Sequence, residues 1–172
     1  ILFDTRILKD IDSETLSSLQ YENIRLHFIY SREGGMMHHE MSNIASTLED
    51  FIYILDDDNI LHENFYNKIS EYFKEGASIP TFPILIFSQL VEGNDFSGVH
   101  TRHALPENIK VGHVDMGQML IHSSYFKNNT IPGVYVGDGL FLETLYKEFS
   151  QNFMFKDVVL CHYNYLQKTS NA

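Results

Sequence analysis

The sequence is poor in cysteine, tryptophan and positive charge, and two of these shortages exclude a class of structure or partner. Cys161 is the single cysteine among 172 residues. No intramolecular disulfide can therefore form, and a reducing compartment is favoured. Lys and Arg number 12 against 23 Asp and Glu, which gives a formal net charge of −11. This balance argues against a nucleic-acid partner, because contacts to a phosphate backbone need clustered cations.

Long apolar runs are also missing. The chain holds no stretch of about 18 apolar residues, so we expect no transmembrane segment in it, and no signal-peptide pattern is visible. The first residue is Ile1, in what reads as the middle of a strand. We infer that N-terminal residues are missing, and with them any anchor or targeting segment. A cytoplasmic location is expected, with a peripheral position at the membrane as the alternative.

What the sequence does contain favours one globular α/β domain. Apolar residues make up 44% of the chain, enough for a core at this length. Strand and helix patterns alternate in the first half, and strands dominate the second. This order predicts a mostly parallel central sheet flanked by helices, with antiparallel additions in the second half. Strands are expected at 1–4, 23–30, 51–55, 82–90, 117–122 and 153–160, helices at 12–20, 40–48, 62–74 and 138–150, and a mobile loop that orders on ligand binding at 91–111.

An acidic triplet follows the apolar run Phe51 to Leu55. Such a run suits a strand buried on both faces, and ligands of open α/β sheets bind beyond the carboxyl ends of the strands. Asp56 and Asp58 are spaced to share one divalent cation, Mn²⁺ or Mg²⁺, which can also hold a diphosphate. The alternative is a solvated acidic turn that caps the next helix through Asn59.

The segment FIYILDDDN resembles the D-x-D region of GT-A glycosyltransferases. Family 2 enzymes have a similar strand ending in an acidic triplet, and the DDDN form also resembles the family 43 glucuronyltransferases. Asn43 stands where many family 2 enzymes carry an Arg-Asn pair, with Ser42 in place of the Arg. The resemblance covers residues 24–73 well and later segments loosely. It implies a single-domain GT-A-like nucleotide-diphospho-sugar transferase fold, with a nucleotide-binding half at 1–90 and an acceptor-binding half at 91–172.

The same resemblance assigns binding roles. Asp4 is similar to the acid that contacts the nucleotide base or ribose, and Asp57 belongs to the donor-binding segment. Gly117 lies in VDMGQMLI, which is similar to a family 43 segment, and would let the backbone approach the donor sugar. His162 resembles the histidine that completes the metal site in several GT-A families, and imidazole suits Mn²⁺ better than Mg²⁺. Its alternative is a structural histidine.

Asp138 is the candidate catalytic residue. In family 2 an acid at a helix start serves as the base, and Asp138 in VGDGLF occupies a similar place. A carboxylate there would take the proton of the acceptor hydroxyl as the sugar carbon is attacked, which inverts the anomeric centre. The alternative is an N-cap for the following helix.

The sequence therefore predicts a metal-dependent glycosyltransferase that moves a sugar from a nucleoside diphosphate sugar to a hydroxyl acceptor. The donor would be a UDP-sugar and the acceptor a carbohydrate or a lipid-linked molecule. Two other functions stay open. One is a nucleotidyltransferase, although Ser31 to Gly35 is a poor phosphate loop. The other is a carbohydrate- or metal-binding module without catalysis.

Overall fold

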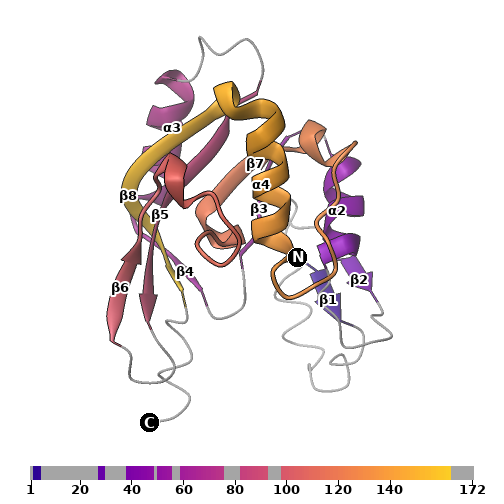
Figure 1. The fold of residues 1–172 in the computed structure, drawn as a ribbon, viewed down its shortest axis with the longest axis horizontal. Coiled ribbons are helices and arrows are strands. Elements are labelled where there is room, and N and C mark those ends of the chain that lie inside the picture. Colours follow the sequence, from indigo (N-terminus) through magenta and orange to yellow (C-terminus); the bar gives the residue numbers. More distant parts are fainter. Residues whose placement is uncertain are drawn as a thin grey trace.

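The computed structural model describes residues 2–4, 27–29, 38–48, 50–55, 59–75, 82–92 and 98–163, and shows a mixed α/β arrangement (Figure 1). Three α-helices and eight strands lie in these ranges. The helices are α2 (His38–Ser46), α3 (Phe65–Glu75) and α4 (Gly137–Phe149). The strands are β1 (Leu2–Asp4), β2 (His27–Ile29), β3 (Phe51–Tyr53), β4 (Ile60–Leu61), β5 (Ile84–Glu92), β6 (Val99–Arg102), β7 (Met119–His122) and β8 (Phe153–Tyr163).

Six of the strands form one mixed sheet. Its order is β3-β7-β5-β8-β4, and β6 pairs with β5 off this path. Strands β5 and β8 are parallel, whereas β7 is antiparallel to both β3 and β5. Consequently β3, β5 and β8 run in one direction, and β4, β6 and β7 run in the other. The mostly parallel sheet expected from the sequence is not confirmed, since one pairing of this sheet is parallel; β1 and β2 form a separate parallel pair.

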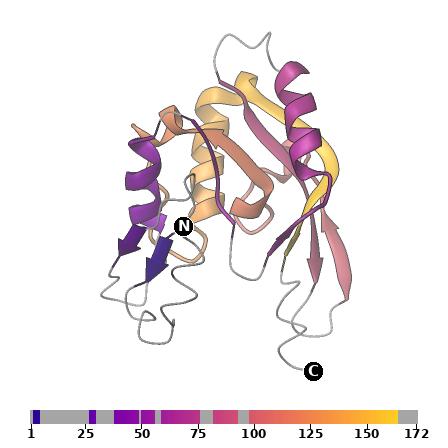
Figure 2. The ribbon, with the colours of Figure 1, turned by 180° about the vertical axis from the view of Figure 1, so that it is seen from behind.

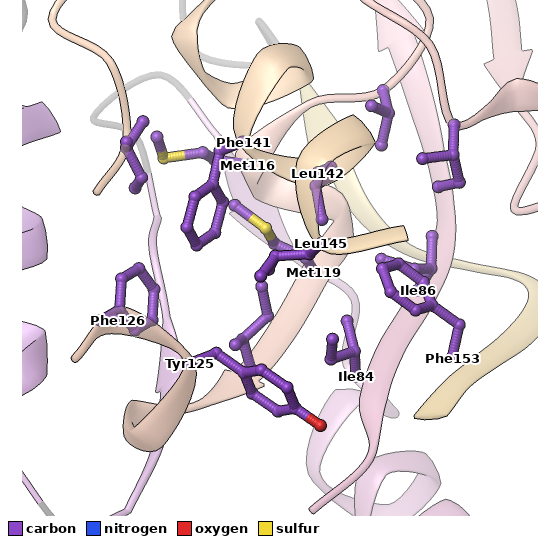
Figure 3. Packing of buried hydrophobic residues seen from close by; sticks show 14 of the residues in the cluster. Ile84, Ile86, Met116, Met119, Tyr125, Phe126, Phe141, Leu142, Leu145 and Phe153 are labelled. Carbon is purple, nitrogen blue, oxygen red and sulfur yellow. The ribbon is translucent and has the colours of Figure 1, made fainter. Parts of the chain in front are cut away.

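The sheet is buried on both faces, because successive side chains of β5 enter two different cores. Ile84 and Ile86 belong to one cluster, and Leu85 and Phe87 to the other. This is the period-two geometry of a strand covered on each side. Helix α4 covers the first face, where Figure 3 shows Phe141, Leu142 and Leu145 packed over Ile84, Ile86, Met119 and Phe153. Helix α3 covers the second face with Phe65, Ile69 and Tyr72.

The helices form where their apolar residues recur at helical spacing. In α3 the buried residues Phe65, Ile69 and Tyr72 stand at i, i+4 and i+7, which aligns them on one side. Lys74 lies in the last turn, where a cation is favourable to the helix dipole. None of the helices in the described ranges combines the length and the apolar character that a membrane crossing needs.

Two predictions about chain segments are wrong. Residues 91–111 were expected to form a loop throughout, yet β5 extends to Glu92, β6 occupies Val99–Arg102, and Ala104 and Ile109 are buried. That this segment orders on ligand binding stays a prediction. The polar residues of this segment concealed an antiparallel pairing of β6 with the end of β5, in which Val99 and His100 are exposed. The last strand also continues three residues past its expected end, because it pairs with both β4 and β5. The helix expected at 12–20 lies outside the described residues.

Candidate functional site

The carboxyl ends of three strands and the start of one helix lie toward the same end of the molecule. Strands β3, β5 and β8 run toward this end, and α4 begins there, in both ribbon views (Figures 1 and 2). The acidic triplet follows β3 in the chain, and Asp138 lies in the first turn of α4. Ligands of open α/β sheets bind at such an edge.

Asp56, Asp57 and Asp58 themselves lie outside the described residues, and so does the side chain of Asp4. The residues that flank the triplet are described. Leu55 is half exposed, whereas the side chain of Asn59 is buried, at 5% exposure. Asn59 then leads into β4, where Ile60 pairs with His162 of β8. The chain is thus in the protein interior at Asn59.

A network of buried amides and charges lies beside Asn59. Gln89 and Gln118 are almost fully buried, and each has several hydrogen-bond partners. The Oε1 of Gln89 accepts a hydrogen bond from Arg102 at 3.1 Å, and its Nε2 donates to Asp115 at 3.2 Å. The Nε2 of Gln118 donates to the backbone carbonyls of Phe87 and Arg102. Buried amides need such partners, so the network fixes Arg102 and Asp115 in place.

Asp115 and Gln118 also shape the backbone between them. The Oδ1 of Asp115 accepts a hydrogen bond from the Gly117 amide at 2.7 Å, and the Oε1 of Gln118 accepts one from the Asp115 amide at 3.2 Å. This reciprocal pair is a capping box, here closing the short 3₁₀ helix Met116–Gln118. Arg102 stands 3.4 Å from the second carboxylate oxygen, Oδ2, and its guanidinium lies 5.0 Å from the ring centre of Tyr163.

Gly117 is held by this network on three sides. A Cβ at this position would stand 2.7 Å from the Nε2 of Gln89, 3.0 Å from Asp115 and 3.2 Å from Asn59. The hydroxyl of Tyr53, on β3, donates to the Gly117 carbonyl at 3.0 Å. Close approach therefore explains the glycine, and the approaching groups are protein side chains. An approach to a donor sugar stays a prediction.

Asp138 lies inside α4 and is not its cap. The helix begins at Gly137 with Val136 as N-cap, so the alternative prediction of a capping aspartate is wrong. The Oδ1 of Asp138 accepts a hydrogen bond from the Gly139 amide at 2.7 Å, which places the carboxylate at the positive end of the helix dipole. The next residue, Gly139, packs tightly against Val111, four residues before Asp115. The first turn of α4 is thereby fixed to the segment that leads into the polar network.

His162 lies within β8, whereas the sequence predicted that it follows the last strand. It is partly buried, and it stands opposite Ile60, two residues after Asp58 in the chain. Its ring centre is 6.2 Å from that of His62. Within the described ranges no group of three metal-binding side chains occurs, and the acidic triplet lies outside those ranges. His162 is thus brought near Asn59 by strand pairing, and metal ligation stays a prediction.

Several polar residues of this region were missed at the sequence level. Arg102, Gln89 and Gln118 received no role, although Ser88 and Gln89 interrupt the apolar run ILIFSQLV and could have drawn attention. The Nδ1 of His103 bonds the carboxylate of Asp157 at 2.8 Å. A hydrogen bond from the Ser88 hydroxyl, together with His103, holds the pKa of Asp157 below its ordinary value.

Comparison with known proteins adds no assignment: the chain matches no family model, and no curated protein is significantly similar to it in sequence.

Proposed function

We propose that the protein is a metal-dependent glycosyltransferase of GT-A-like fold that uses a nucleoside diphosphate sugar. The observation that carries the proposal is the position of Asn59. It directly follows the acidic triplet, it is buried, and it lies against Gly117 beside the Arg102–Asp115 network. The residue that follows the proposed metal ligands is thereby held beside the polar network.

The sheet supports the same proposal. Strands β6 and β7 are antiparallel strands from the second half of the chain, where the sequence predicted antiparallel additions. Strands β3, β5 and β8 share a direction, and the triplet, Asp138 and His162 belong to the segments at their carboxyl ends. One end of the sheet would then hold both the metal ligands and the base.

The residues present suit a hard divalent cation. Asp56 and Asp58 would hold Mn²⁺ or Mg²⁺, with His162 as a further ligand that favours Mn²⁺. The bound cation would offset the negative charge that develops on the leaving diphosphate. Asp138 would take the acceptor proton from its place in the first turn of α4, and the carboxylate is pre-positioned there by the Gly139 amide.

The metal site is tested by nucleotide binding. Wild-type protein should bind UDP in calorimetry only when Mn²⁺ is present, and Asp58→Ala should abolish this binding because a shared ligand is lost. Glu71→Gln, on the exposed side of α3, removes the same charge elsewhere and should bind as the wild type does. UDP binding that is equally tight with and without metal would contradict the assignment. Sugar binding without nucleotide would favour a carbohydrate-binding module.

The base is tested by turnover. Asp138→Asn keeps the side-chain oxygen that accepts from Gly139 but cannot take up a proton, so transfer or donor hydrolysis should fall about 10²–10⁴-fold. Donor binding should stay nearly unchanged, because the residue acts in the chemical step. Initial rates with Mn²⁺ and a panel of UDP- and GDP-sugars measure the effect. Full activity of this variant would leave Asp138 without a catalytic role.

A further inference from the structure

The ion pair of Arg102 and Asp115 differs from an ordinary surface pair in how it is supported. Gln89, with 0% exposure, contacts both partners, and Gln118 bonds the backbone of both. The Tyr163 ring lies beneath the guanidinium. Surface pairs lose most of their stabilisation to side-chain entropy, whereas this pair is fixed before any ligand arrives. Such a support is what a binding site needs.

The pair also keeps hydrogen-bonding capacity. The side chains of Arg102 and Asp115 are 25% and 14% exposed, so solvent reaches both. The Oδ1 of Asp115 accepts two hydrogen bonds, but Oδ2 has only the 3.4 Å contact with Arg102 in the described part of the chain. Arg102 donates from Nη1 alone among those same residues, although a guanidinium carries five N–H groups.

We propose that Arg102 and Asp115 bind the hydroxyl groups of an uncharged sugar, so that the enzyme selects a neutral hexosyl donor over a uronosyl one. The inference rests on the proposed function and narrows its substrate. Neighbouring hydroxyls of a pyranose present one donor and one acceptor a short distance apart. The carboxylate of Asp115 takes the hydrogen of one hydroxyl, and a guanidinium N–H of Arg102 donates to the oxygen of the next.

Charge balance separates neutral from acidic sugars. The guanidinium and the carboxylate neutralise each other, so the pair offers no net positive charge. A uronate carboxylate placed here would meet the Oδ2 of Asp115, and like charges brought together oppose binding. The segment DDDN resembles glucuronyltransferases, but the Arg102–Asp115 pair favours the opposite choice of sugar.

The pair lies where a donor sugar would have to be. Asp115 is within reach of Gly117, and Gly117 is in turn beside Asn59, the residue that follows the proposed diphosphate–metal ligands. The sugar attached to a metal-bound diphosphate would therefore extend toward this pair.

The test compares UDP, UDP-glucose and UDP-glucuronate by calorimetry with Mn²⁺, and repeats the comparison with UDP-galactose and UDP-galacturonate. Within each pair the sugars differ only in a hydroxymethyl or carboxylate group. We expect one neutral sugar to tighten binding over UDP by at least about threefold, and its uronate to bind about tenfold more weakly than the neutral form. Asp115→Asn should narrow that ratio, because the repelling charge is gone. Arg102→Gln should widen it, because the balancing cation is gone.

The outcomes separate the two proposals. Absent metal-dependent UDP binding overturns the proposed function and this inference with it. If UDP binding is intact but the uronate binds as tightly as its neutral partner or more tightly, the inference alone is overturned. The same holds if neither Asp115→Asn nor Arg102→Gln changes the ratio of the two affinities. Glu71→Gln is the charge-matched control and should keep the wild-type ratio. Thermal unfolding of each variant shows whether it folds, and the ratio within one folded variant is independent of its stability.

Discussion

At the residue scale, hydrogen bonds between polar side chains link β5, β8 and the segment after β6. The Ser88 hydroxyl donates to Asp157 at 2.5 Å and accepts from the Ala104 amide at 2.9 Å, and His103 contacts the same carboxylate. Here β8 is irregular, since the pairing shifts register on either side of Ser88. Asp157 therefore ties the irregular part of β8 to the segment that follows β6.

Asp157 should make stability depend on pH in the acid range. Its pKa lies below the ordinary value of 3.8, first through the Ser88 hydrogen bond and then through His103. A carboxyl with a lowered folded-state pKa contributes stability that is present above its unfolded pKa and is lost as pH falls through the folded one. Asp157→Asn should lower the urea midpoint at pH 7, and the difference from wild type should shrink below pH 3.8. If the urea midpoints of the two proteins differ by the same amount at pH 7 and below pH 3.8, Asp157 does not have this role.

At the element scale, the placement of α4 depends on one glycine. A Cβ at Gly139 would stand 2.8 Å from the Cα of Val111, which is backbone and cannot turn aside. Glu143, one turn further on, accepts a hydrogen bond from the Val111 amide at 2.7 Å. The two contacts hold the segment before Asp115 against the helix that carries Asp138.

Gly139→Ala should therefore destabilise the protein, although alanine favours helices over glycine by about 1 kcal/mol. Moving the backbone apart to admit the methyl group should cost about 1–3 kcal/mol, measured by urea denaturation. Gly133→Ala is the matched control, because nothing lies within 4 Å of its Cβ position, and it should change stability by less than about 0.5 kcal/mol. Equal stability of the two variants would show that α4 moves freely on this segment.

The helices and strands that the sequence predicted are those whose apolar residues recur at a regular spacing within the element itself. The apolar spacing of α3 and the unbroken run of β5 identified both, because each buries its residues at a regular period. Strand β4 has two residues, and β6 is an outer strand with exposed residues, so neither carries a pattern of its own. Both exist because of partners distant in sequence.

At the scale of the whole molecule, the sequence predicted the fold class but not the strand directions. A mixed α/β arrangement followed from alternating patterns, whereas the antiparallel direction of β7 depends on how the chain crosses between layers.

The residues of the candidate site also fall into those that sequence predicted and those that it missed. Asp138 was predicted from the motif VGDGLF and does lie in the first turn of α4, while its catalytic role stays a prediction. Arg102 and Gln89 were missed because they meet only through the register of β5 with β6.

The burial of Cys161 makes the alkylation rate of its thiol a measure of local opening of the protein. Its side chain is 0% exposed, its sulfur lies 3.9 Å from the Nε2 of Gln89, and it is the chain's single cysteine. A thiol reagent can react only after the region around Gln89 opens, so the alkylation rate reports that opening. A ligand that binds only the closed form at ten times its Kd should slow alkylation about elevenfold. Metal-bound UDP should do so in the native protein, and labelling in urea should proceed at the rate of an unprotected thiol.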